Sequence, residues 1–128
     1  MLPFQFVIAG PPFSAQSDNR EALADWQLRV QAVAATEWAG PVFRGKVHVV
    51  VTYYHEGETA RLDNDNMIKP ILDALEGVVY DNDRQASYIE VRSLNLKRAA
   101  RLRRVGAVVG WELVRGGEFL HILVEEER

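Results

Sequence analysis

The segment KVHVVVTYY, residues 46–54, constrains the fold most strongly, because a run of β-branched and aromatic residues is typical of a strand. A polar loop follows it, and residues 66–76 then carry an apolar stripe at helical spacing. That stripe consists of Ile68, Ile71, Leu72 and Leu75. Residues 87–94 alternate again between apolar and polar, as in a strand. The chain therefore combines a sheet with helices.

The flanking sequence adds further elements. Residues 4–8 alternate as a strand, and residues 17–37 are typical of a helix that Ser17 or Asp18 can cap. The predicted buried face of that helix is formed by Leu23, Trp26, Val30 and Val33. Residues 97–104 form either a basic helix or a loop. Further strands are predicted at 78–80, 105–114 and 119–125. We predict an α+β fold in which two main helices pack on one face of a small mixed β-sheet.

The length of 128 residues suits one domain, 1–128, with its own core. Apolar residues make up 48% of the chain, which indicates a globular protein. Cysteine is absent, which excludes disulfides and thiolate metal ligands and is consistent with a reducing cytosol. The N-terminal apolar run lacks the basic region of a signal peptide, and no segment approaches the roughly 18 apolar residues of a membrane span. We expect a cytoplasmic protein with no membrane partner.

Carboxylates cluster around the helix predicted at 66–76. Asp63 and Asp65 alternate just before it, so in an extended segment both point to the same side. Lys69 follows Asp65 by four residues and Asp73 follows Lys69 by four, which is the spacing of one helical face. These residues are therefore candidates for one site.

Pro70 limits where that helix can begin, since proline removes a backbone donor from a helix interior. A start near Met67 would place Pro70 in the first turn, where N–H groups lack partners in any case. Asp63 and Asp65 would then lie in the loop before the helix, and Lys69 in its first turn.

Two more carboxylates, Asp81 and Asp83, follow this helix in the sequence. Carboxylates that converge on one point raise one another's pKa unless a cation neutralises them. Oxygen ligands without His or Cys favour Mg²⁺, or Mn²⁺, over zinc. The alternative is a helix cap and a polar loop whose carboxylates are simply solvated. The histidines His48, His55 and His121 lack metal-ligand spacing and are expected to be surface or structural residues.

The net charge of −3 conceals a strong asymmetry. Residues 58–90 carry eight acids and three bases, whereas residues 92–104 carry six bases and no acid. A cation site beside a phosphate-binding surface would show this pattern, although a solvated charge run would as well. The candidate DNA-binding residues are Arg92, Lys97, Arg98, Arg101, Arg103 and Arg104. The chain has no GxxxxGK phosphate loop, so no nucleotide cofactor is expected.

The acidic region resembles the RusA family of Holliday junction resolvases. The match is dense over residues 61–93 and follows the pattern Asp63-x-Asp65-Asn66-x-x-Lys69-x-x-x-Asp73-Ala74-Leu75, then Asp83-x-Gln85. The resemblance implies a small homodimeric, Mg²⁺-dependent endonuclease of bacterial or phage origin. Such an enzyme binds four-way DNA junctions and cuts two strands symmetrically, in recombination and repair.

The resemblance also implies roles for single residues. Asp63, Asp65 and Asp83 match the metal-binding carboxylates, and Lys69 matches the catalytic lysine. The supporting positions, by hydrogen bonding or by holding the lysine, are matched by Asn66 and Asp73. Two features depart from the family. Asn82 stands where a second aspartate is usual, with Asp81 as an additional candidate ligand one place earlier, and the chain is acidic where resolvases tend to be basic.

Three alternatives remain open on sequence. The chain could be a nuclease that acts on flaps, forks or RNA through the same site. It could be an inactive or accessory DNA-binding module, although the joint presence of Asp63, Asp65, Lys69 and Asp83 argues against lost activity. It could also present an acidic surface that binds no metal.

Overall fold

A computed structural model describes residues 2–57, 64–99 and 106–127 of the chain. Four strands and four α-helices occur in these ranges, together with one short 3₁₀ helix. In chain order they are β1 (Phe4–Ala9), α1 (Arg20–Glu37), β2 (Val47–His55), α2 (Asn64–Leu75), η1 (Asp83–Gln85), β3 (Ala86–Asn95), α3 (Leu96–Ala99), α4 (Ala107–Arg115) and β4 (Phe119–Glu126). The predicted α+β class is confirmed.

The strands form one sheet in the order β1-β4-β2-β3. β4 pairs antiparallel with both β1 and β2, whereas β2 and β3 are parallel. Parallel neighbours need a crossover connection, and α2 lies in the connection from β2 to β3. The sheet is therefore mixed, as expected. β3 lies at an edge of the sheet, beside α2.

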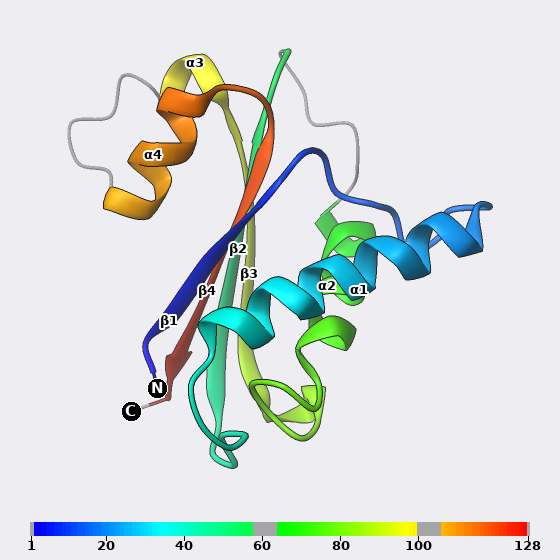
Figure 1. Cartoon of the computed structure of the whole chain (residues 1–128), viewed down its shortest axis with the longest axis vertical. Coiled ribbons are helices and arrows are strands. Elements are labelled where there is room, and N and C mark those ends of the chain that lie inside the picture. Colours follow the sequence, from blue (N-terminus) through cyan, green and yellow to red (C-terminus); the bar gives the residue numbers. More distant parts are fainter. Residues whose placement is uncertain (1, 58–63, 100–105, 128) are drawn as a thin grey trace.

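The main core lies between one face of the sheet and the helices α1 and α2 (Figure 1). Alternate strand residues face these helices, because successive side chains of a strand point to opposite sides. From the strands the core includes Phe4, Phe6, Ile8, Val49, Val51, Tyr53, Leu120, Ile122 and Val124. From the helices it includes Trp26, Val30, Ala34, Met67, Ile71 and Leu75.

A second, smaller core lies on the opposite face, near one end of the sheet. Tyr54 and Phe119 stack there with ring centroids 4.5 Å apart, and Ala99 of α3 and Val109 of α4 join them. The strand predicted at 105–114 is wrong, since residues 107–115 form α4. The valines of this segment favoured a strand in the prediction. Val109 and Leu113, however, are four residues apart, which is the spacing of one helical face, and both pack into the smaller core. The helix ends at Gly116, whose φ of 83° suits a glycine C-cap.

The helix α1 begins later than predicted. Asn19, rather than Ser17 or Asp18, is the N-cap residue, and its side-chain oxygen accepts the N–H of Ala22 at 3.0 Å. Of the predicted face, Leu23, Trp26 and Val30 are buried, and Val33 packs partly buried against the core.

The helix α2 begins at Asn64, so the predicted start near Met67 is wrong and Pro70 lies inside the helix. Proline has no N–H to donate to the carbonyl of Asn66, four residues earlier. That carbonyl instead accepts the backbone N–H of Ala15 at 2.9 Å. The loop before α1 therefore supplies the missing hydrogen bond, which explains how the helix continues through a proline.

The strand predicted at 78–80 is also wrong. These residues form a turn in which the N–H groups of Val78 and Val79 point back to the carbonyl of Leu75, at 3.2 and 3.0 Å. Gly77 adopts a φ of 80° that reverses the chain. Tyr80 makes isolated bridges to Phe43 and Glu76. No helix in the described ranges is long and apolar enough to cross a membrane.

His121 of β4 makes folding pH-dependent. Its Nε2–H donates to Gln5 Oε1 at 2.8 Å, because an amide oxygen can only accept. Burial, and secondly the charge of Arg92, hold the pKa of His121 below its ordinary value of 6.5. The unfolded chain then binds more protons than the folded protein just below pH 6.5. The contribution of His121 to stability is therefore full above pH 6.5 and is lost as the pH falls towards the folded pKa.

We expect His121→Gln to flatten the pH dependence of stability between pH 7.5 and 5.5. Glutamine does not titrate and can still bond to Gln5. Urea unfolding of both proteins at several pH values measures the effect. If the free energy of unfolding changed equally with pH in wild type and variant, this role of His121 would be contradicted.

Candidate active site

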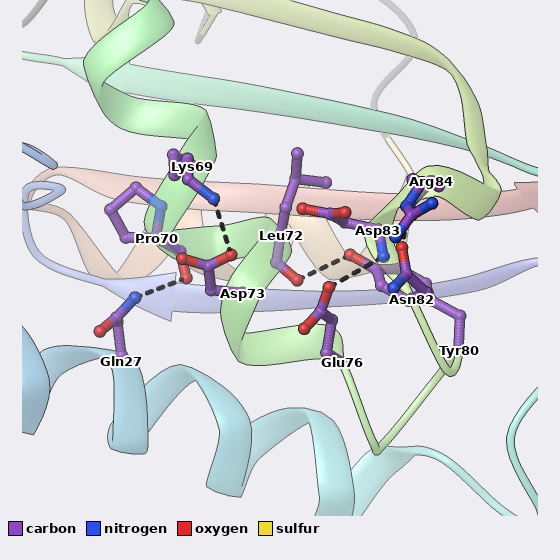
Figure 2. Close-up of polar contacts among 10 residues, drawn as sticks. All are labelled: Gln27, Lys69, Pro70, Leu72, Asp73, Glu76, Tyr80, Asn82, Asp83 and Arg84. Carbon is purple, nitrogen blue, oxygen red and sulfur yellow. Dashed lines mark hydrogen bonds and ion pairs between the residues drawn. The ribbon is translucent and has the colours of Figure 1, made fainter.

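One side of α2 carries the lysine and an acid, and a second acid follows directly after the helix. Lys69 and Asp73 are four residues apart on α2, and Glu76 comes just after its last residue, Leu75. Lys69 Nζ donates to Asp73 Oδ1 at 3.2 Å, and both side chains are accessible to solvent (Figure 2). This pair fits the expected role of Asp73 in holding the lysine.

Asp83 is brought to this helix face from η1. Its backbone N–H donates to Glu76 Oε1 at 2.9 Å, and Figure 2 shows its carboxylate above Leu72. Tyr80 is buried beneath and donates its hydroxyl to the carbonyl of Leu72 at 2.7 Å. The turn that follows α2 is thus tied to the helix at two points.

The carboxylates of Asp73, Glu76 and Asp83 shift the pKa values of Lys69 and Tyr80. The pKa of Lys69 is raised, chiefly by the hydrogen bond and charge of Asp73, with further contributions from Asp83 and Glu76. The pKa of the Tyr80 hydroxyl is also raised, first by burial and then by the charges of Asp83, Glu76 and Asp73. Lys69 is therefore fully protonated at neutral pH, with the carboxylate of Asp73 in contact and those of Asp83 and Glu76 acting on it through their charge.

Gln85 fixes the turn that carries Asp83. Its Oε1 accepts the N–H groups of Asp81 and Asn82 at 2.9 and 3.1 Å, and its Nε2 donates to the carbonyls of Phe43 and Gly45 at 2.8 and 2.9 Å. An amide side chain has two donors and an oxygen that accepts twice, and all are used here. This explains the glutamine two residues after Asp83.

We expect Gln85→Ala to lower the free energy of unfolding by about 3 kcal/mol, since four hydrogen bonds contribute roughly 1 kcal/mol each and part is recovered by water. Gln85→Glu keeps the two acceptor bonds but turns a carboxylate oxygen towards the carbonyl oxygens of Phe43 and Gly45, so it should also lower the free energy of unfolding. Urea unfolding measures both. Equal stability of Gln85→Ala and wild type would contradict the role of this side chain.

Asn82, which replaces the usual aspartate, caps η1. Its Oδ1 accepts the N–H of Arg84 at 2.9 Å, and together with Gln85 it forms a capping box. Capping needs a side-chain oxygen and no charge, so asparagine can fill this position as well as aspartate. Asp81 pairs with Arg44, Oδ2 to Nη1 at 3.3 Å. Its carboxylate therefore has a partner outside the cluster of Lys69, Asp73, Glu76 and Asp83, here called the Lys69 group.

The remaining predicted acids lie at the start of α2. Asp65 is exposed in the first turn, where the helix dipole favours a negative charge, and it precedes Lys69 by one turn. Asn66 is half-buried, and its backbone carbonyl anchors Ala15. Asp63 lies outside the described residues.

The basic residues divide between two surfaces. Arg92 pairs with Glu90 at 3.2 Å and lies level with Thr52, on the sheet face opposite to α2. Lys97 and Arg98 are exposed on α3, beyond the end of β3. The other three, Arg101, Arg103 and Arg104, lie outside the described residues.

The donors available to a cation are carboxylate oxygens, which suit Mg²⁺ or Mn²⁺. Among residues 2–57, 64–99 and 106–127, no three His, Cys, Asp or Glu side chains gather as a metal-binding group. The third carboxylate of the predicted set, Asp63, lies outside these ranges. The chemistry of the donors thus fits the predicted ion, while the complete ligand set stays a prediction.

Sequence reasoning missed Glu76. Its carboxylate orients the backbone of Asp83 and contributes to the raised pKa of Lys69. The spacing of seven residues from Lys69 and three from Asp73 could have revealed it, because these separations return to the same helix face.

Comparison with known proteins points to one family. The family model described as endodeoxyribonuclease RusA matches residues 16–103, which include α1, the Lys69 group and the described part of the basic segment. A search of curated proteins found no match.

Proposed function

Because the chain belongs to the RusA endodeoxyribonuclease family, we propose that it is a metal-dependent endonuclease that resolves four-way DNA junctions by paired, symmetric cuts. The observation that carries the proposal is the position of Lys69, an exposed cation held beside Asp73 and close to Asp83 within the matched region. A nuclease needs a positive group beside carboxylates that hold a cation.

Lys69 would act on the scissile phosphate directly. As the attacking oxygen adds, negative charge grows on the phosphoryl oxygens, and a lysine ammonium within reach stabilises that charge. Asp73 holds the ammonium group through a hydrogen bond of 3.2 Å, which restricts the flexible side chain. The raised pKa of Lys69 keeps its ammonium group charged at neutral pH.

Asp63, Asp65 and Asp83 would hold the cation, Mg²⁺ or Mn²⁺. Bound there, the ion would polarise a phosphate oxygen and lower the pKa of an attacking water. Glu76 and Gln85 would position Asp83 through its backbone and turn. Asp81 is left out of this set because it pairs with Arg44.

Two copies of the chain would account for two symmetric cuts. A two-fold homodimer presents two identical sites, and a four-way junction offers two equivalent strands. The net charge of −3 means that DNA contacts depend on local basic residues rather than on the average charge. Among the described residues, Lys97 and Arg98 of α3 are the basic candidates for DNA contact.

The test is cleavage of a mobile four-way junction by the purified protein, with Mg²⁺ and then Mn²⁺. Linear duplex, flap and fork DNA of the same sequence serve as substrates for comparison. We expect paired nicks in the junction and little cutting of the linear duplex. Equal cutting of flaps and forks would indicate a nuclease with a broader branched substrate. Binding without cleavage in both metals would make the protein a DNA-binding module.

A further inference from the structure

A polar cavity of about 460 Å³ opens at the ends of β2 and β3, away from the Lys69 group. Its lining includes His55, Ser93, Asn95, Lys97 and Arg98. Two cations and no acid occur among the described lining residues. A cavity with this lining favours an anion.

The floor of the cavity is braced by side-chain bonds. Asn95 Nδ2 donates to the carbonyl of Gly57, and Asn95 Oδ1 accepts the N–H of Lys97 at 2.8 Å. His55 is 4% exposed, with Nδ1 3.3 Å from the carbonyl oxygen of Glu56. An imidazole bonded through Nδ1 has Nε2 for a second partner. Asn95 and His55 are thus held in place before any ligand arrives.

Part of the cavity lining lies on the same face of the sheet as α2, whereas α3, which carries Lys97 and Arg98, packs through Ala99 against the smaller core on the other face. Tyr53 and Val91 pack towards α1 and α2, and side chains two residues further along a strand share that face. His55, Ser93 and Asn95 therefore lie on the side of α2, whereas Arg92 lies on the other side. Asp83 is the first residue of η1, directly before β3, whereas the cavity lies at the last residues of β3. Ten residues at about 3.3 Å each separate the two by roughly 30 Å.

We propose that this cavity binds a backbone phosphate of the DNA arm, at a distance from the phosphate that is cut. This role rests on the proposed function. Along the duplex axis each base pair advances a strand by about 3.4 Å, so 30 Å corresponds to roughly nine base pairs. Lys97 and Arg98 supply the charge, and Asn95 and His55 shape the walls. The contact positions the arm and takes no part in the chemistry.

The first experiment tests the cavity without DNA. Inorganic phosphate is titrated into the metal-free protein at constant ionic strength, while the side-chain NMR signals of His55 and Asn95 are followed. We expect saturable shifts that are lost in the Lys97→Ala/Arg98→Ala double variant. Lys46→Ala, at the other end of β2, removes the same charge and should keep them. Absence of saturable shifts in wild type, or equal shifts in the double variant, would overturn the proposal.

The second experiment identifies DNA as the source of the phosphate. Junctions with arms of about 15 and about 6 base pairs are compared. With long arms the double variant should show KM raised on the order of tenfold, an unchanged kcat, and a log–log salt slope reduced by about two. With short arms the double variant and wild type should have equal KM. A lowered kcat, or the same KM ratio at both arm lengths, would contradict a remote contact.

The two experiments separate failures. A wild-type protein that binds phosphate in the cavity but cuts no junction disproves the proposed function, since the first experiment needs no cleavage. A protein that cuts junctions and shows no phosphate shifts disproves the cavity's role alone.

Discussion

Asp65→Asn is expected to abolish junction cleavage while the protein still binds the junction. Asparagine keeps the shape of the side chain and removes the charge that would hold the cation. The loss of several kcal/mol of transition-state stabilisation corresponds to about 100-fold or more in rate. Junction binding in EDTA should be equal or slightly tighter, because one negative charge near the DNA is gone. Calorimetric titration with Mn²⁺ should show weaker binding than wild type.

The matched control is Asp25→Asn, which removes one exposed carboxylate from α1. It should cleave like wild type, so that a general effect of charge is excluded. Folding of Asp65→Asn is checked by urea unfolding, where we expect a loss of no more than about 1 kcal/mol from the helix dipole. Full cleavage by Asp65→Asn would remove Asp65 from the site.

Lys69→Ala is expected to lower kcat by roughly 10²- to 10³-fold, the usual effect of removing one donor that stabilises developing charge. KM and junction affinity should change less than about threefold, because one of many cations is lost. The exposed ion pair with Asp73 contributes at most about 1 kcal/mol, so the variant should fold normally. Single-turnover cleavage and gel-shift binding measure the two effects separately.

Two further variants sharpen this experiment. Lys69→Arg restores a positive charge on a planar group of different geometry, so we expect partial recovery of kcat. Asp73→Asn leaves Lys69 in place and weakens its tether, and its kcat should fall less than that of Lys69→Ala. If Lys69→Ala instead raised KM and left kcat unchanged, the lysine would be a DNA-binding residue and not a catalytic one.

The candidate site could be located from sequence because its residues lie close together in the chain. Lys69 and Asp73 are four apart on one helix, and helical geometry alone brings such a pair together. Their contact at 3.2 Å agrees with that expectation. The strands at 46–54, 87–94 and 119–125 could also be predicted, because β-branched and alternating residues report burial directly.

Elements whose local preference conflicts with tertiary contacts could not be predicted in this way. Residues 105–114 are rich in valine, yet 107–115 form a helix because Val109 and Leu113 pack into the smaller core. Pro70 led to the prediction that α2 begins near Met67. The structure allows an earlier start because Ala15, over fifty residues away, bonds the carbonyl that proline leaves open.

The sequence by itself determined the fold class, the family and the acidic helix face, since all three depend on residue type and local spacing. Tertiary structure alone decided which groups meet across the chain. Glu76 reaches the backbone of Asp83, Gln85 bonds to the 43–45 loop, Asp81 turns to Arg44, and Arg92 faces away from α2. These contacts depend on where the turn after α2 returns to the sheet and on the strand register, which the packing of the whole core sets.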